Sequence, residues 1–223
     1  MDAPKLGHGD HWLAALHQDD PRIADALATP IDAPEGVHVA RSPLTEALDM
    51  VQVTARRRLV TAFPEPRATS LAHAFPRRLD LWPTRVEGWL TVEHEGAGAL
   101  TLFPTDLAEH AAYYQSAGTR RGLGLELGAL AYVAHARPGE RGAPRVAPAS
   151  REDARFLPDD YAFEGLVLDA RAAGEAEVLD LAFQNGLEMP VVVREPTRAK
   201  PGDHVEGYLW LTGRRASGPP REG

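Results

Sequence analysis

The alternation of apolar and polar residues is clearest from Arg85 onward, where it predicts a β-hairpin. Small or apolar residues occupy every second position of the first strand: Val86, Gly88, Leu90 and Val92. This period of two is typical of half-buried strands. Glu95 to Gly98, with the sequence EGAG, supplies a turn, and Ala99 to Phe103 returns as the partner strand.

A short helix and a long strand are predicted after the hairpin. Pro104 ends the second strand, and Thr105 is a suitable N-cap for a helix of about two turns over DLAEHAAYY. Apolar residues then alternate over eleven positions: Leu123, Leu125, Leu127, Ala129, Ala131 and Val133. A strand of this length is expected to curve strongly, serving two sheets or wrapping a small barrel. Glycines at positions 122, 124 and 128 permit the bending.

A second group of strands is predicted near the C-terminus. It comprises Tyr161 to Ala170, Glu177 to Phe183, Met189 to Arg194, and Val205 to Leu211. Asn185-Gly186 is a strong signal for a tight turn between the middle two. The stretch from Arg137 to Asp153 is rich in Pro, Gly and Ala and is interpreted as a linker between the two groups.

The N-terminal part is expected to mix helices and extended segments. Trp12, Leu13, Leu16, Ile23 and Leu27 approximate a helical stripe. Asp20 followed by Pro21 predicts a helix start, with the helix running to about Ala28. Ser42-Pro43 is a similar signal and favours a second helix from Thr45 to about Val53, followed by a strand. The β-branched and aromatic residues of 51–63 leave a strand throughout as the alternative.

Together these elements predict a mainly β (α+β) protein with helical N-terminal segments. Two arrangements fit: two small antiparallel β units, or one larger OB-like β-barrel to which both groups of strands belong. We divide the chain into residues 1–84, packed on the β body; a first β unit, 85–136; a linker or loop, 137–156; a second β unit, 157–213; and a disordered tail, 214–223. Val86 to Leu90 and Val205 to Leu209 share a VEG-aromatic-Leu pattern and are candidates for equivalent positions in related units.

Three phrases resemble a family of uncharacterised bacterial proteins. Those proteins have a DDYxF start, a Gly-Asp turn and a final Gly-x-Leu-Trp-Leu-x-Gly strand, as in DDYAFEG (159–165) and PGDHVEGYLWLTG (201–213) here. The crossing FPTDLAEHAAYYQSAG and the following LGALAY (103–132) are similar to the same family. The resemblance covers roughly residues 85–213 and implies a compact β-barrel-like or OB-like body. It implies no particular activity.

Composition narrows the class of protein. The chain has 223 residues, 43% of them hydrophobic and 25% charged, as in ordinary soluble globular proteins. No apolar run approaches the ~20 residues needed to cross a bilayer, so we expect no membrane association. The N-terminus lacks the layout of a secretory signal, and the absence of Cys excludes disulfides and thiolate metal sites. A cytoplasmic location is expected.

Charge is unevenly distributed. The net charge of −8 disfavours non-specific binding to polyanions, but residues 41–85 carry eight basic and four acidic residues, a local balance of +4. We call these 45 residues the basic island. Its candidate binding residues for nucleic acid or a partner are Arg56, Arg57, Arg58, Arg77, Arg78 and Trp82. Arginines with exposed aromatic rings bind single-stranded nucleic acid in other proteins. The alternative is a surface that pairs with the acidic remainder, within the chain or across a protein interface.

The other aromatic residues suggest a ligand groove. Tyr113, Tyr132, Tyr208 and Trp210 are expected at sheet faces, where their apolar bodies pack and their polar tips reach partners. They are the candidate residues of such a groove.

Candidate chemistry is otherwise sparse. His8, Asp10, His11 and His17 form the densest potential metal cluster, but their spacing matches no known zinc pattern, so no metal site is predicted. The best acid–base candidates are Asp106, Glu109, His110, Asp159 and Asp160. Turn chemistry explains Asp159 after Pro158, and a helix start explains Asp106 and Glu109. No catalytic set and no cofactor are therefore predicted.

The sequence favours a non-enzymatic binding or assembly module that recognises a protein partner, or a second copy of itself, through its β surfaces. The first alternative is a single-strand nucleic-acid-binding module that uses the basic island. The second is a small hydrolase-like enzyme using Asp, Glu and His, which requires two such groups within reach of one point in a pocket.

Overall fold

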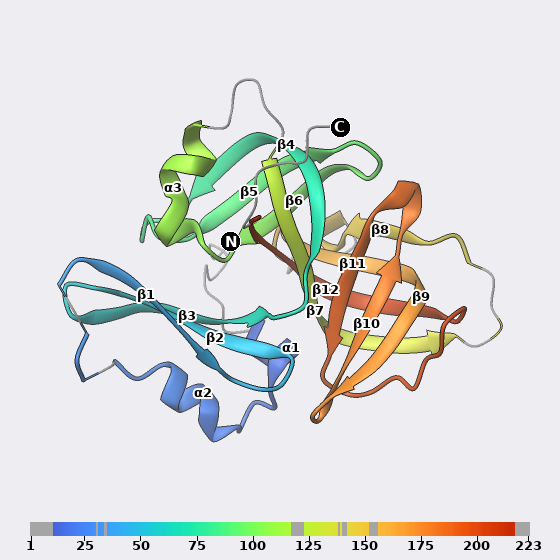
Figure 1. The fold of residues 1–223 in the computed structure, drawn as a ribbon, viewed down its shortest axis with the longest axis horizontal. Coiled ribbons are helices and arrows are strands. Elements are labelled where there is room, and N and C mark those ends of the chain that lie inside the picture. Colours follow the sequence, from blue (N-terminus) through green and yellow to red (C-terminus); the bar gives the residue numbers. More distant parts are fainter. Residues whose placement is uncertain are drawn as a thin grey trace.

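The computed structural model describes residues 11–29, 31–33, 35–116, 123–137, 139, 142–151 and 156–216 (Figure 1). Twelve β-strands and three short α-helices make up most of this described part, which confirms the mainly β fold class. None of the helices within it is long and apolar enough to cross a membrane.

A first five-stranded barrel follows from the pairing of the central strands. β4 (Ser70–Leu81), β5 (Gly88–His94) and β6 (Gly98–Pro104) form an antiparallel meander. β7 (Leu123–Arg137) pairs with β4, and β12 (His204–Arg215) pairs in parallel with β6. Because β7 and β12 also pair with each other, these pairings form a closed ring. α3 (Leu107–Ser116) connects β6 to β7.

A second ring uses the same two long strands. β9 (Asp160–Ala173), β10 (Ala176–Ala182) and β11 (Glu188–Val193) form another antiparallel meander. β9 pairs with β12, and β11 pairs in parallel with β7. The two rings therefore have the same connectivity. In the first ring, β7 pairs with the first strand of the meander and β12 with the last; in the second ring, β12 pairs with the first strand and β7 with the last. Figure 1 shows β7 and β12 between the two groups of strands.

Close packing of the shared strands depends on glycine. A Cβ at Gly207 would lie 1.9 Å from the carbonyl oxygen of Val133 on β7, and the register of the β12–β7 pair shifts just beyond, between Tyr208 and Leu209. Gly88 occupies a similar place on β5, because its Cβ would lie 2.4 Å from the carbonyl oxygen of Asp80 on β4. Both glycines belong to the VEG pattern. The pattern thus marks close backbone approach, not equivalent barrel positions, since β5 is the counterpart of β10 and β12 that of β7.

The N-terminal segments form a smaller layer beside the barrels. β1 (Val37–Pro43), β2 (Leu48–Ala55) and β3 (Arg58–Pro66) form a separate antiparallel sheet. α1 (His11–Ala15) contacts β7, β11 and β12. α2 (Pro21–Ala26) begins where the sequence predicts, because the Asp20 carboxylate accepts the backbone N–H of Arg22 at 2.9 Å.

Two groups of buried side chains hold this arrangement together. One fills the barrels and includes Leu90, Leu125 and Leu179. The other packs α1 and the small sheet against the outer face of the barrels and includes Trp12, Phe63 and Trp210. The second group fixes α1 and the small sheet on the β body.

The predicted helix from Thr45 to Val53 is wrong. The hydroxyl of Thr45 accepts the backbone N–H groups of Ala47 and Leu48, which shapes a turn between β1 and β2 and not a helix start. Leu48, Val51 and Val53 are buried in the β2 strand that follows. Pairing on both sides with β1 and β3 overrides the local helix signal.

Two expected boundaries also change. Within the stretch interpreted as a linker, Arg145–Pro148 forms β8, which pairs with β9, and residues Ala149–Arg151 form a single 3₁₀ turn. β4 lies before residue 85 but belongs to the first barrel. Asn185-Gly186 lies, as expected, in a tight turn, the 3₁₀ segment Gln184–Gly186. Of the tail, Arg214 and Arg215 extend β12, and residues 217–223 lie outside the described residues.

Candidate functional site

The most unusual chemistry lies where β9 begins, beside both barrels. Asp159 and Asp160 follow Pro158 at the turn into β9, and both side chains are buried. The backbone N–H of Leu211 donates to the carbonyl oxygen of Asp159 at 2.9 Å, which joins this turn to β12. Adjacent carboxylates in a protein interior are costly unless hydrogen bonds or cations compensate for their charge.

Two tryptophans hold the Asp159 carboxylate. The indole Nε1–H of Trp89, on β5, donates to Oδ1 at 3.0 Å, and that of Trp210, on β12, donates to Oδ2 at 2.8 Å. Asp159 is fully buried, and burial followed by the charge of Asp160 raises its pKa to about 7, whereas the indole hydrogen bonds act in the opposite direction. One of the two donors, Trp89, therefore comes from the first barrel alone, and the other, Trp210, comes from a strand that both barrels share.

Asp160 is held separately. The Tyr132 hydroxyl, on β7, donates to Oδ1 at 2.7 Å, and the backbone N–H of Leu157 donates to Oδ2 at 2.7 Å. The Leu157 contact closes the turn before β9, so Asp160 both shapes the backbone and presents a carboxylate to the interior. Its Oδ1 lies 3.9 Å from Nε2 of His11.

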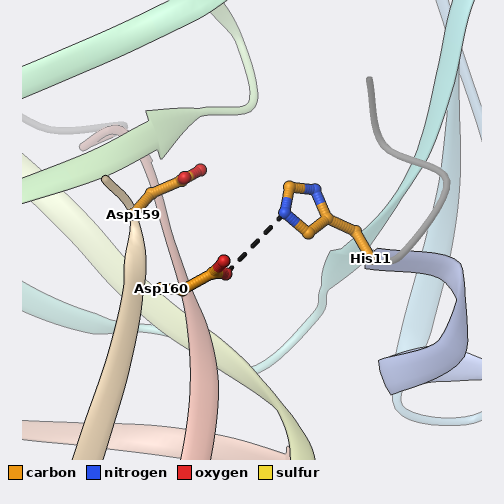
Figure 2. A group of neighbouring side chains, drawn as sticks. All are labelled: His11, Asp159 and Asp160. Atoms are coloured by element: carbon orange, nitrogen blue, oxygen red, sulfur yellow. Dashed lines mark ion pairs between the residues drawn. The ribbon is translucent and has the colours of Figure 1, made fainter. Parts of the chain in front are cut away.

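His11 brings the N-terminal segment to this centre. It is the first residue of α1, is 1% exposed, and stacks on Trp210 with ring centroids 4.0 Å apart and planes 13° apart. Figure 2 shows its imidazole directed at the two carboxylates. One nitrogen and two carboxylate oxygens from the three side chains lie within 4.8 Å of one another. We call His11, Asp159 and Asp160 the His-Asp-Asp centre.

Arg194 fastens α1 from its other end. This residue follows β11, and its Nη1 donates to the carbonyl oxygens of Leu13 at 2.7 Å and Leu16 at 2.9 Å. Carbonyl groups at a helix C-terminus lack helical partners, so a guanidinium placed there both satisfies and positions them. α1 is thus held at the His-Asp-Asp centre by His11 and at β11 by Arg194.

A cleft of about 780 Å³ lies at the C-terminal end of α1, opposite the end that carries His11. Its walls come from the end of α1, the start of α2, the β1–β2 turn, the β9–β10 turn and the segment after β11, which meet near α1 (Figure 1). Leu16, Leu48 and Val192 contribute buried apolar surface. Its charged groups are Asp20, Arg22, Glu46, Glu175, Arg194 and Glu195.

The structure separates the residues predicted for the basic island. Arg56, Arg57 and Arg58 lie at the exposed turn between β2 and β3, whereas Arg77 and Arg78 lie on β4 of the first barrel. Ion pairs engage three of these arginines: Arg57 with Glu35, Arg77 with Glu93, and Arg78 with Asp80. Trp82 is 5% exposed and packs against Trp89 with ring centroids 5.2 Å apart. The expectation that Trp82 is an exposed ring available for stacking on a base is therefore wrong.

The aromatic residues predicted for a ligand groove also divide. Tyr132 and Trp210 both contact the His-Asp-Asp centre. Tyr208 stacks on Phe156 with ring centroids 5.0 Å apart, at a shallow pocket of about 290 Å³. Tyr113 lies under the guanidinium of Arg215. The four rings do not form one groove.

The remaining acid–base candidates belong to another cluster. Asp106 is buried and accepts hydrogen bonds from the Tyr114 hydroxyl and from the Arg215 backbone N–H. Glu109 pairs with Arg41 at 2.7 Å, and His110 lies 3.9 Å from Asp106. Of the N-terminal histidines and aspartates, only His11 reaches the centre among the described residues; His17 lines the cleft, and His8 and Asp10 lie outside the described residues.

Comparisons with known proteins give little further guidance. No family model and no curated protein matches the chain. Among solved structures, the cytoplasmic molybdate-binding protein ModG aligns with 66% of this chain and 98% of its own, at 15% sequence identity and a TM-score of 0.35. This likeness is too weak to carry an argument about fold or ligand.

Proposed function

We propose that this protein is a non-enzymatic binding module and that the cleft beside α1 is its binding site. The cleft volume of about 780 Å³ lies within the range of small-molecule sites, which are mostly apolar with a few polar groups that orient the ligand. The His-Asp-Asp centre is the best acid–base set in the described residues, but its side chains are at most 4% exposed. A substrate atom cannot reach them in this conformation, which supports binding over hydrolysis.

The charge balance of the cleft indicates the class of ligand. Four carboxylates line it against two guanidiniums: Asp20, Glu46, Glu175 and Glu195 against Arg22 and Arg194. Asp20 already pairs with Arg22 at 2.6 Å, and Glu195 pairs with Arg194 at 3.0 Å. The two carboxylates that remain, Glu46 and Glu175, form no salt bridge with any other residue in the described part of the chain. This excess of negative charge beside an apolar floor is the observation that carries the proposal.

The ligand is therefore a molecule or segment that joins an apolar body to a positively charged amine. A basic, apolar segment of a partner protein has this chemistry, as does a free organic amine. The apolar body gains from leaving water against the accessible apolar lining of the cleft, which includes Ala176 and Pro196. The cation gains from Glu46 and Glu175.

A matched series of probes tests this proposal. We expect 4-phenylbutylamine to bind more tightly than 4-phenylbutanol, and 4-phenylbutyrate to bind weakest, with about a tenfold preference for the amine over the carboxylate. Isothermal titration calorimetry at low and physiological salt measures the affinities, and the preference should shrink as salt screens the carboxylates. The capped peptides N-acetyl-Leu-Lys-Leu-amide and N-acetyl-Leu-Glu-Leu-amide, which have no terminal charges, form a second arm that distinguishes a protein segment from a free amine.

Substitutions in the cleft locate the site. Glu46→Gln with Glu175→Gln should remove the preference for the amine while leaving the fold intact, because both side chains are exposed. Glu188→Gln, an exposed carboxylate on β11 outside the cleft lining, is the matched control. Equal affinities of the three phenylbutyl probes for the unaltered protein would refute the proposal.

A further inference from the structure

We propose that His11, Asp159 and Asp160 bind a divalent first-row transition-metal ion. This ion fastens α1 to the start of β9, beside the shared strand β12. The ligand atoms come from three places: α1, the turn before β9, and β9 itself. They converge within 4.8 Å of one another, and each side chain is more than nine-tenths buried.

The spacing of the ligand atoms suits such an ion. Metal–nitrogen and metal–oxygen bonds of about 2.0–2.2 Å place neighbouring ligand atoms about 3–3.5 Å apart in a tetrahedral set. His11 Nε2 and Asp160 Oδ1 are 3.9 Å apart, and the three ligand atoms lie within 4.8 Å of one another, so the side chains must draw together by up to about 1.5 Å to hold an ion. One imidazole nitrogen with carboxylate oxygens suits zinc, manganese or ferrous iron, whereas soft thiophilic ions have no thiolate here because the chain contains no Cys.

The surrounding hydrogen bonds are of the kind that orients metal ligands. The indoles of Trp89 and Trp210 hold the two oxygens of Asp159, and the Tyr132 hydroxyl holds Oδ1 of Asp160. The two indoles leave each oxygen of Asp159 a second lone pair for an ion. Outer partners of this type fix ligand orientation in metal sites.

Charge supplies an independent reason for a cation. Asp159 is fully buried and pairs with no Arg, Lys or His among the residues that the structure describes; its side-chain partners there are the two neutral indoles. A second carboxylate, Asp160, is its neighbour in the chain. A buried carboxylate that lacks a cation is unfavourable, and a divalent ion beside Asp159 compensates for its charge.

The first experiment measures metal binding by the full-length protein after treatment with a chelator. Titration with Zn²⁺, Mn²⁺ and Mg²⁺ by isothermal titration calorimetry should give one site per chain, with Zn²⁺ or Mn²⁺ bound at least tenfold more tightly than Mg²⁺. Two of the four tryptophans contact the centre. Co²⁺, which absorbs visible light and quenches nearby indoles, should therefore lower tryptophan fluorescence with the same one-to-one stoichiometry.

Variants locate the ion. His11→Gln, Asp159→Asn and Asp160→Asn should each weaken Zn²⁺ binding by at least tenfold and abolish the Co²⁺ quenching. His73→Gln, an exposed histidine on β4, is the matched control and should bind as the unaltered protein does. Circular dichroism shows whether each variant is folded. If a buried aspartate variant does not fold, the comparison of His11→Gln with His8→Gln keeps the test decisive, because an ion at the centre needs His11 but not His8, whereas an ion held by the N-terminal histidines needs both.

Two outcomes would overturn the proposal. One is the absence of stoichiometric binding of Zn²⁺, Mn²⁺ and Co²⁺ to the folded protein. The other is binding that His11→Gln weakens but that folded Asp159→Asn and Asp160→Asn both retain, because the ion would then be held by the histidine-rich N-terminus and not by the centre.

Discussion

At the scale of single residues, the packing of the two barrels depends on positions where no side chain fits. Gly207 faces the backbone of β7, with its Cβ position only 1.9 Å from the carbonyl oxygen of Val133. The neighbouring atom is backbone within a paired strand, so it cannot move aside as a flexible side chain would. The glycine is therefore required by the close approach of β12 to β7.

Gly207→Ala should destabilise the protein by about 3 kcal/mol or more, because the added methyl group forces the shared strands apart. Gly186→Ala is the control: its φ is +77° and nothing lies within 4 Å of its Cβ position, so only backbone strain of about 1 kcal/mol is expected. Urea denaturation of both variants measures the difference. Similar losses of stability would contradict the packing argument.

Asp106 offers a pH test at the same scale. Its carboxyl is 4% exposed and accepts the Tyr114 hydroxyl and the Arg215 N–H, and burial raises its pKa above the ordinary value of 3.8. The folded protein therefore binds this proton more tightly than the unfolded chain. The contribution of protonated Asp106 to the free energy of unfolding is complete below pH 3.8, the ordinary pKa of the unfolded chain. It is lost as the pH rises through the raised pKa of the folded state.

Asp106→Asn removes this titration and leaves a neutral acceptor. Relative to the unaltered protein, the variant should be least stable at acidic pH and gain stability as the pH rises from about 4 to 8. Paired urea denaturation curves across this range measure the free energy of unfolding of each protein. Parallel pH profiles would show that Asp106 does not carry the expected shift.

At the scale of elements, α1 depends on one guanidinium. Arg194→Met keeps the apolar stem but removes both hydrogen bonds to the carbonyl oxygens of Leu13 and Leu16. We expect a loss of about 1.5–3 kcal/mol in the stability of this segment. Hydrogen exchange at the Leu16 amide, which donates to Trp12 at 2.8 Å, should accelerate at least tenfold while exchange in β12 changes little. Uniform acceleration across the chain would contradict a local role.

Elements were predictable from the sequence where the local pattern and the final pairing agree. The β5–β6 hairpin, α3, β7 and the strands from β9 to β12 follow from alternation and turn residues. The cap signal at Ser42-Pro43 favours a helix over residues 45–53, but pairing with β1 and β3 on both sides makes β2 a strand. β8 was missed because four residues of an edge strand carry too little pattern.

The candidate site could be predicted only in fragments. The sequence places His11 in a potential metal cluster with its neighbours but predicts no metal site, and turn chemistry explains Asp159. The convergence of the two residues depends on β12, which brings Trp210 to both. The proximity of α1 to the start of β9 is visible only in the folded structure. No local spacing in the sequence encodes it.

At the scale of the whole molecule, the shared strands make the two barrels interdependent. β12 closes the first barrel between β6 and β7, although it lies near the end of the chain. We expect one cooperative thermal transition for the full chain, and a fragment of residues 1–156 should be unfolded because its first barrel lacks β12. Calorimetry and proton–nitrogen correlation spectra measure the two cases. A dispersed spectrum from the fragment would show that the first barrel folds alone.

The whole molecule also connects the proposed metal centre with the proposed cleft through α1. His11 begins this helix at the centre, whereas Ala15, Leu16 and His17 line the cleft at its other end. An ion that fastens His11 should therefore order one wall of the cleft before a ligand arrives, so less conformational entropy is lost on binding. Saturating Zn²⁺ should lower the Kd for 4-phenylbutylamine several-fold.

Linkage requires the reverse effect of the same size: 4-phenylbutylamine should increase the affinity for Zn²⁺ by the same factor. His11→Gln should abolish the coupling while the amine still binds with the weaker affinity of the zinc-free protein, since Glu46 and Glu175 are untouched. Calorimetric titrations in both orders measure the two factors. If zinc binds at the centre and the amine binds in the cleft but the Kd for the amine is the same with and without zinc, the two sites are independent and α1 does not connect them.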